Sequence, residues 1–221
     1  MRDHLTFFKQ FRQRFKTTGA IAPSSRFLAS AMVGPMKKAL KDPQGPTRRI
    51  LEVGPGTGAV TRSIVKILRP KDRFDLVELN ETFVDLLEQR FESHAHYRKA
   101  KEQSAIHRLP LQDFAAEEPY DFIISGLPLN NFSSDLVREI FDCYFRLLAP
   151  GGTLSYFEYM YVRSIRKHVG PREEKLRMRS LDEIIGPYLK QHRIRQSWVF
   201  INLPPAWVQH LQLSREPRAE S

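Results

Sequence analysis

Short apolar runs alternate with amphipathic stretches between residues 48 and 161 of this chain. The apolar runs indicate buried strands, and the apolar residues between them recur every three or four positions, which is typical of helices. The expected strands are 50–53, 74–78, 105–107, 121–124 and 153–161, and the expected helices are 59–68, 81–91 and 136–148. This order predicts an α/β fold, with a mostly parallel sheet covered by helices on both faces.

The two ends of the chain follow a different pattern. A short helix is expected from Phe27 onward, and the breaker Asp-Pro-Gln-Gly-Pro at 42–46 separates it from the alternating region. The basic segment 163–179 is expected to be a solvated loop and the start of a helix, continued by helix 180–192. A last strand, 198–203, is expected to pair with 206–211. The predicted divisions are an N-terminal amphipathic helix and lid region, a cofactor-binding domain and a flexible tail, at 1–46, 47–213 and 214–221.

Residues 1–16 predict an amphipathic helix. Phe8, Phe11 and Phe15 fall on one side, and Arg12 borders this apolar face. Aromatic residues on one face with basic residues around it are typical of a helix that lies in a membrane interface. The alternative is a helix that packs its phenylalanines onto the domain, and the two are compatible if the helix exchanges between states.

Charge is the unusual feature of the composition. The net charge of +10 favours an anionic partner, either nucleic acid or an acidic membrane surface, and does not choose between them. The single cysteine, Cys143, excludes an internal disulfide, and a reducing cytoplasm is the default location. We find neither a membrane-spanning run nor a secretory signal, and the histidines show no metal-ligand spacing.

A glycine-rich turn follows the first expected strand. Gly54, Gly56 and Gly58 leave the backbone free to turn tightly and to approach a ligand without a Cβ in the way. The helix that follows offers unpaired N–H groups to that ligand. With Glu78 about 20 residues further on, the turn fits a dinucleotide fingerprint. With Glu52 ahead of it, the turn also fits the S-adenosylmethionine turn of class I methyltransferases, in which the carboxylate holds the amino-acid part of the cofactor through water.

The segment after the fourth strand separates these interpretations. Residues 125–132 are Ser-Gly-Leu-Pro-Leu-Asn-Asn-Phe. Here the chain resembles the bacterial phospholipid N-methyltransferases, relatives of the ribosomal-RNA adenine dimethylases. The resemblance covers most of the chain and rests on four stretches, namely the Phe7-Phe8 and Phe11 opening, Thr-Gly-Ala-Ile-Ala-Pro-Ser-Ser at 18–25, the turn at 52–58, and Ser-Gly-Leu-Pro at 125–128.

The resemblance implies that residues 125–128 replace the Asn/Asp-Pro-Pro-aromatic motif of amino-methylating enzymes. In that motif a side-chain oxygen and a backbone carbonyl accept hydrogen bonds from the target nitrogen and aim its lone pair at the methyl group. Ser125 and the carbonyls of Gly126 and Leu127 would do this here, and Glu158 or water would take the amine proton. The fourth position of this segment holds no aromatic residue that could stack on a flipped base. This absence argues against an RNA substrate.

The other expected site residues follow from the turn and the resemblance. The expected cofactor contacts are Ser25, Glu52, Gly54, Pro55, Gly56, Gly58, Glu78, Leu79, Gln112, Asp113 and Ser125. For Asp113 and Ser25 the alternative is a capping or turn role. The expected substrate or membrane contacts are Phe8, Phe11, Arg12, Phe15, Pro128, Asn131 and Tyr159. Tyr159 would stabilise a methylated ammonium by cation–π attraction, or would simply belong to the core.

The predicted function is S-adenosylmethionine-dependent N-methylation of the amine of a membrane lipid, with S-adenosylhomocysteine as product. The lipid is phosphatidylethanolamine with its methylated intermediates, or an ornithine-type aminolipid. The implied fold is a Rossmann-like class I methyltransferase domain with a seven-stranded sheet and an N-terminal amphipathic extension. The alternatives are an RNA adenine N-methyltransferase and a non-catalytic cofactor-binding module on a lipid surface. We expect a cytoplasmic monomer, bound peripherally to the anionic inner face of the membrane.

Overall fold

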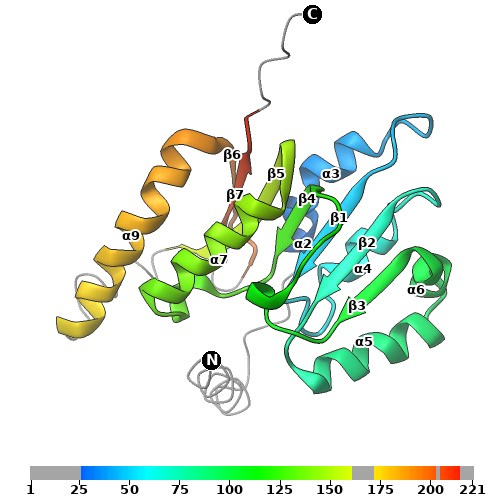
Figure 1. The fold of residues 1–221 in the computed structure, drawn as a ribbon, viewed down its shortest axis with the longest axis horizontal. Coiled ribbons are helices and arrows are strands. Elements are labelled where there is room, and N and C mark those ends of the chain that lie inside the picture. The colour runs from blue at the N-terminus through cyan, green and yellow to red at the C-terminus, as the bar shows by residue number, and fades with distance from the viewer. Residues whose placement is uncertain (1–25, 161–171, 203–204, 215–221) are drawn as a thin grey trace, which may run out of the picture.

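The structure is a computed structural model that describes residues 26–160, 172–202 and 205–214 (Figure 1). A seven-stranded sheet in the order β3-β2-β1-β4-β5-β7-β6 runs through its centre. The strands are β1 Arg49–Val53, β2 Arg73–Val77, β3 Ser104–His107, β4 Tyr120–Ser125, β5 Leu148–Tyr159, β6 Arg193–Val199 and β7 Ala206–Gln212. The pairs from β3 to β5 are parallel, whereas β7 is antiparallel to both of its neighbours. The predicted mostly parallel sheet is confirmed.

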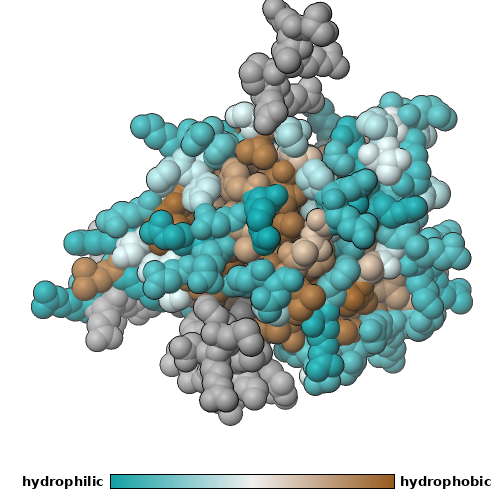
Figure 2. All heavy atoms as spheres, viewed as in Figure 1, coloured by the Kyte–Doolittle hydropathy of each residue, from teal (hydrophilic) through white to brown (hydrophobic). Residues whose placement is uncertain are grey.

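Helices cover both faces of the sheet (Figure 1). One buried cluster joins the sheet to α2 Arg26–Met32, α3 Gly34–Ala39, α4 Thr61–Val65, α5 Glu81–Ser93 and α6 Ala95–Ala100. A second cluster joins the opposite face to α7 Ser134–Leu147 and α9 Arg172–His192. Because successive strand residues point to opposite faces, Ile50 enters the first cluster and Leu51 the second. Figure 2 shows that the outer sides of α5 and α9 are mostly hydrophilic, as amphipathic helices require.

Most of the expected elements are found, with shifted boundaries. The expected helix 59–68 is shortened to α4, because the glycine turn continues through residues 56–60 before regular helical structure begins. Helix α6 was not predicted, since its six residues carry only a weak apolar pattern. The last strand pair was expected to begin at residue 198, but β6 begins at Arg193. As an edge strand β6 carries polar side chains along its first residues, so it lacks the apolar run that marks a buried strand.

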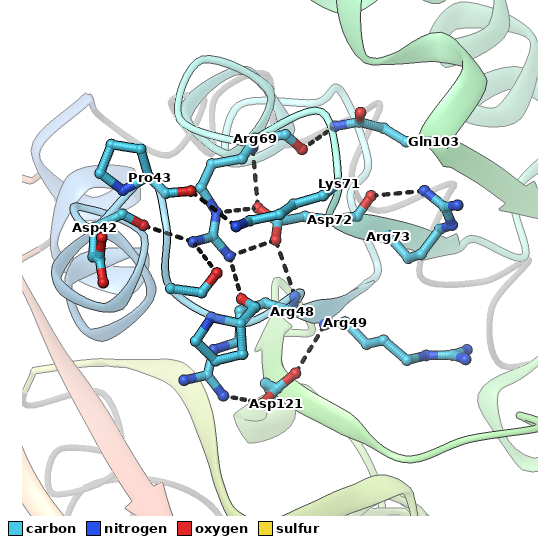
Figure 3. A network of polar contacts seen from close by, with 12 residues as sticks. Asp42, Pro43, Arg48, Arg49, Arg69, Lys71, Asp72, Arg73, Gln103 and Asp121 are labelled. Atoms are coloured by element: carbon cyan, nitrogen blue, oxygen red, sulfur yellow. Dashed lines mark hydrogen bonds and ion pairs between the residues drawn. The ribbon is translucent and has the colours of Figure 1, made fainter.

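A polar network closes the end of the sheet where β1 and β2 begin (Figure 3). The Asp72 side chain is fully buried and accepts hydrogen bonds from the backbone N–H groups of Arg48 and Arg69, each at 3.0 Å. The Arg69 guanidinium donates to the same carboxylate through Nε at 3.0 Å and Nη2 at 2.7 Å. It also donates to the carbonyls of Asp42 and Pro46, at 2.8 and 2.6 Å. This ion pair therefore fastens the loop before β1 to the start of β2.

Replacing Asp72 with Ala is expected to lower the free energy of unfolding by about 3–5 kcal/mol, because the Arg69 guanidinium, whose side chain is only 10% exposed, loses its counter-charge. Urea denaturation followed by circular dichroism measures this loss. The Asp42→Ala variant is the matched control, since Asp42 is exposed and its carboxylate accepts one local hydrogen bond from the Gln44 N–H. It should lose less than about 1 kcal/mol. Equal losses in the two variants would contradict a stabilising role for the buried pair.

Candidate active site

The glycine turn joins β1 to α4 at the carboxyl end of the parallel strands. Gly54, Gly56 and Gly58 have φ angles of 66°, 54° and 72°, in the left-handed region that favours glycine. A Cβ at Gly54 would stand 2.5 Å from Leu127 Cδ2, and one at Gly58 would stand 2.8 Å from Arg90 Nη1. At Gly56 the nearest atom would be a Phe83 ring carbon, 4.0 Å away. The outer glycines are thus fixed by the protein's own packing, whereas Gly56 faces open space that a ligand could fill.

Glu78, an expected cofactor contact, lies directly beside this turn. Its carboxylate accepts hydrogen bonds from the N–H groups of Gly56 at 3.0 Å and Asn80 at 2.8 Å. Burial raises the pKa of Glu78, and backbone N–H groups, that of Asn80 first, act in the opposite direction. The carboxylate is therefore held in one orientation, with each oxygen retaining a lone pair for a ligand hydroxyl.

Side chains from α5 and α6 support the turn from below. Arg90 Nη1 donates a hydrogen bond to the Thr57 carbonyl, and the Tyr97 hydroxyl donates to the Gly58 carbonyl at 3.0 Å. Sequence reasoning missed both supports. Arg90 lies in the expected helix 81–91, for which no site role was predicted, and Tyr97 lies in the unpredicted α6. No signal in the sequence distinguishes these two residues from ordinary helix residues.

Glu52, expected to hold the amino-acid part of the cofactor, lies at the end of β1 and is 1% exposed. Among the described residues, neither its Oε2 atom nor the nearby Thr61 Oγ1 atom has a hydrogen-bond partner. Burial raises the pKa of Glu52 to about 8, Thr61 lowers it in part, and the Glu78 carboxylate raises it further. Buried polar atoms without partners are rare in folded proteins. A bridging water, as expected for the cofactor's ammonium group, would satisfy them.

A cavity of about 30 Å³ opens beside the turn, between the carboxyl ends of β1 and β2. Five of the expected site residues line it, namely Gly54, Glu78, Leu79, Gln112 and Leu127. Ligand pockets commonly measure roughly 300–1,000 Å³, so a nucleoside would have to displace side chains here. Leu127, which packs against Gly54, is the side chain best placed to move.

Gln112 and Asp113, two neighbouring residues that were expected to contact the cofactor, have different surroundings in the structure. Gln112 lines the cavity and its amide donates a hydrogen bond to Glu139 at 3.3 Å. Asp113 is exposed and lies outside the lining, in the 3₁₀ turn Leu111–Asp113. Its N–H donates to the Pro110 carbonyl at 3.0 Å, which corresponds to the turn role that was the alternative interpretation.

The loop after β4 lies against the glycine turn. A Cβ on Gly126 would stand 2.5 Å from the Gly54 carbonyl oxygen, so only glycine permits this approach. The Ser125 hydroxyl is buried, 2.5 Å from the Tyr144 hydroxyl, and accepts a hydrogen bond from the Leu127 N–H at 3.3 Å. The Leu127 carbonyl accepts from the Leu129 N–H, whereas no described backbone N–H donates to the Gly126 carbonyl. Ser125 therefore supports the loop, and the Gly126 carbonyl is the acceptor available to a ligand.

Helix α9 holds the next part of this loop, which contains the expected substrate contacts Pro128 and Asn131. Arg177 Nη1 donates hydrogen bonds to the carbonyls of Asn130 at 3.1 Å and Phe132 at 2.9 Å. The sequence had placed Arg177 in a solvated basic segment, so this supporting role was missed. A basic residue in such a segment carries no sign that it will pack against a loop some 45 positions earlier.

Strand β5 brings one of its two expected site residues to the side of Ser125. Ser125 pairs with Tyr156, and Glu158 lies two positions further along the same face, buried opposite Trp207. Glu158 therefore projects beyond the end of β4, next to the loop. Tyr159 points to the other face, where its ring packs edge-on against Phe157 with centroids 5.2 Å apart. In this arrangement Tyr159 serves the core rather than the pocket.

Some expected contacts cannot be placed. Ser25 and the N-terminal residues Phe8, Phe11, Arg12 and Phe15 lie outside the described residues. In the part of the chain that is described, no helix has the length and apolar character needed to cross a membrane.

Comparisons with known proteins identify the fold. Residues 50–152 match the model of a family described as "Methyltransferase domain". The structure resembles the O-methyltransferase TomG of Streptomyces achromogenes, with a TM-score of 0.59, 16% identity and coverage of 88% of this chain and 82% of that one. The chain has the class I methyltransferase fold, and residues 50–152 match a methyltransferase domain.

Two further similarities concern the cofactor and the substrate. The methyltransferase resembles the N-methyltransferase NodS of Bradyrhizobium japonicum, with a TM-score of 0.57, 16% identity and coverage of 91% of this chain and 97% of that one. The TomG structure is a complex with S-adenosylmethionine, and the NodS structure a complex with S-adenosylhomocysteine. These two neighbours therefore bind S-adenosylmethionine or its product rather than a dinucleotide. The methyltransferase is also 29% identical over 170 residues to an ornithine lipid N-methyltransferase of Singulisphaera acidiphila, covering 76% of this chain and 85% of that protein.

Proposed function

We propose that this methyltransferase N-methylates the amine head group of a membrane lipid, with S-adenosylmethionine as the methyl donor. The observation that carries the proposal is the similarity to the ornithine lipid N-methyltransferase, which extends over 76% of this chain and 85% of that protein. Of the two lipid classes expected from the sequence, this similarity favours an ornithine-type aminolipid over phosphatidylethanolamine. The geometry of the β4 loop is compatible with either, because it offers an acceptor to an amine and no platform to an aromatic base.

The residues around the turn fit the donor. S-Adenosylmethionine supplies a methyl group activated by its positively charged sulfur. Gly56 leaves room for the ligand, Glu78 presents oriented oxygens to ribose hydroxyls, and the buried Glu52 offers a carboxylate to the ammonium group. The chain's main contribution is then to position the acceptor amine and exclude water.

The acceptor amine must lose a proton before it can attack, because a primary amine in water has a pKa of about 10. Transfer from water into a partly buried site lowers that pKa. The Gly126 carbonyl would accept a hydrogen bond from the amine and orient its lone pair. Glu158, which projects past the end of β4 on the same face as Ser125, would take the proton directly or through water.

The deciding experiment follows a labelled methyl group from S-adenosylmethionine into two acceptors in parallel reactions. One reaction holds anionic vesicles containing ornithine lipid or phosphatidylethanolamine, and the other holds structured RNA. We expect label in the lipid, with ornithine lipid the better acceptor. Label in RNA alone would overturn the lipid assignment in favour of the RNA alternative. The net charge of +10 is also consistent with an RNA partner. Label in neither would favour the non-catalytic module.

A deletion of residues 1–16 tests the role expected for the N-terminal segment. If the predicted amphipathic helix docks the enzyme on lipid, the deletion should lower vesicle binding and lipid methylation together. Methylation of a water-soluble, short-chain version of the same lipid is the control, and it should persist. Full activity on vesicles after the deletion would show that this segment is not required for docking.

A further inference from the structure

Large exposed apolar side chains gather at one place in the described part of the chain. Six such residues are 40% or more exposed, and the three most exposed are Trp198, Phe200 and Ile201, at 56, 62 and 72%. They lie at the end of β6, where the chain turns toward β7, and we refer to these three residues as the hairpin tip. Soluble domains rarely expose large apolar residues in such a group unless the surface binds something.

The hairpin tip borders a groove of about 480 Å³ between β6 and α2. Phe27 of α2 lies on the other side of this groove and is 40% exposed. Arg195 is the one Lys, Arg, Asp or Glu among the described residues that line it. Arg193 is also exposed on β6, and the Arg26 guanidinium lies 4.9 Å from the centre of the Phe27 ring. The apolar surface is therefore bordered by positive charge, and the described residues of the groove lining include no acidic side chain.

The hairpin tip lies at the same end of the sheet as the candidate active site. Tyr159, at the carboxyl end of β5, pairs with Ala206, and Ala206 pairs with Val199. The tip therefore extends from the edge at which β1 and β4 also end. Neighbouring strands are about 4.8 Å apart, so β6 lies roughly 15 Å from β4 across the sheet. A flat surface that meets the tip would pass close to the β4 loop.

We propose that the hairpin tip, together with Phe27, is a lipid-contact surface that seats this methyltransferase on an anionic bilayer beside its active site. The inference rests on the proposed function, and it names a docking surface separate from the N-terminal segment. Tryptophan and phenylalanine favour the membrane interface, where an apolar ring can enter the lipid while polar groups remain hydrated. Arg26, beside Phe27, and Arg195, which lines the groove, supply the charge that attracts an anionic surface.

A second copy of the chain is the other partner that this surface could take, because β6 is an edge strand. Pairing of two β6 strands would bring Arg193 and Arg195 of both copies into neighbouring strands, where like charges oppose association. Such pairing would also leave the hairpin tip outside the paired strands, so that its apolar side chains would stay exposed. The distribution of charge and exposed aromatic rings thus favours lipid.

Tryptophan fluorescence can test the contact directly, since the chain has two tryptophans, Trp198 and the half-buried Trp207. In the full-length Trp207→Phe variant, all tryptophan emission comes from Trp198. Vesicles of phosphatidylglycerol and phosphatidylcholine with brominated acyl chains, containing no aminolipid, should quench this emission at least twofold. Unquenched Trp198 in protein that sediments with the vesicles would overturn the proposal.

A matched pair of isoleucines on the same hairpin provides the control. Ile201→Glu places a negative charge on the tip and should weaken vesicle binding about tenfold or more. Ile194→Glu makes the same change at the opposite end of β6, where the side chain is 55% exposed, and should leave binding unchanged. Equal weakening by both variants, or a wild-type dimer in light scattering that both variants dissociate, would overturn the proposal in favour of an interface between copies.

The outcome is independent of methyl transfer, because these vesicles hold no acceptor. Quenching of Trp198 without label in any lipid would support the surface and overturn the proposed function. Label in aminolipid vesicles without quenching of Trp198 would support the proposed function and overturn the lipid-contact surface.

Discussion

The Gly56→Val variant is expected to bind S-adenosylmethionine at least ~100-fold more weakly than the wild type, a loss of about 2.7 kcal/mol, while keeping its fold. A Cβ at this position meets no protein atom closer than 4.0 Å, so the valine methyl groups would extend into the space left for the ligand. The φ angle of 54° adds backbone strain of about 1–2 kcal/mol for a residue with a side chain. Both effects act on the turn, and the strain is too small to unfold a typical domain.

Isothermal titration with S-adenosylmethionine measures this loss, and thermal unfolding checks that the fold is retained. The Gly34→Val variant is the control, because a Cβ there also meets no atom within 4 Å but the φ angle is not positive. Its affinity should equal that of the wild type. Unchanged affinity in Gly56→Val would mean that the cofactor site lies elsewhere.

The parts of the site that the sequence could predict are those set by local chain geometry. A strand followed by three alternating glycines and a helix predicts a tight turn at the end of the strand, and the structure places Gly56 in that turn with Glu78 beside it. Alternation along a strand also puts Glu158 on the same face as Tyr156, whereas the pairing of β4 with β5 is known only from the structure.

The parts that the sequence could not predict depend on contacts between distant elements. The Ser125 hydroxyl was expected to face the substrate, but a tyrosine 19 positions later takes it as a hydrogen-bond partner. Asp113 was expected to contact the cofactor, but it is exposed in a 3₁₀ turn while its neighbour Gln112 lines the cavity. Arg90 and Tyr97 support the glycine turn only because α5 and α6 pack beneath it. Propensity and periodicity carry no information on these contacts.

The Glu52→Gln variant is expected to be more stable than the wild type at alkaline pH and equally stable at acid pH. Burial raises the pKa of Glu52 to about 8 in the folded protein, compared with 4.5 as its ordinary value. The folded state thus holds the proton more tightly than the unfolded state, and wild-type stability falls as the pH rises from about 4.5 to about 8. Above that range the carboxylate is charged in both states and the difference stays constant, at a value on the order of 5 kcal/mol.

Denaturant unfolding of the wild type and the variant between pH 5 and pH 9 tests this expectation, with Glu102→Gln as the control for loss of an exposed carboxylate. The stability difference should grow with pH for Glu52→Gln and stay near zero for Glu102→Gln. A difference that does not change with pH would mean that Glu52 is already ionised in the folded protein. The Glu52→Gln variant should also bind S-adenosylmethionine more weakly, because the neutral amide offers no counter-charge to the ammonium group. A substitution that stabilises the fold while weakening the ligand would mark a residue retained for binding, since polar groups in binding sites commonly cost stability.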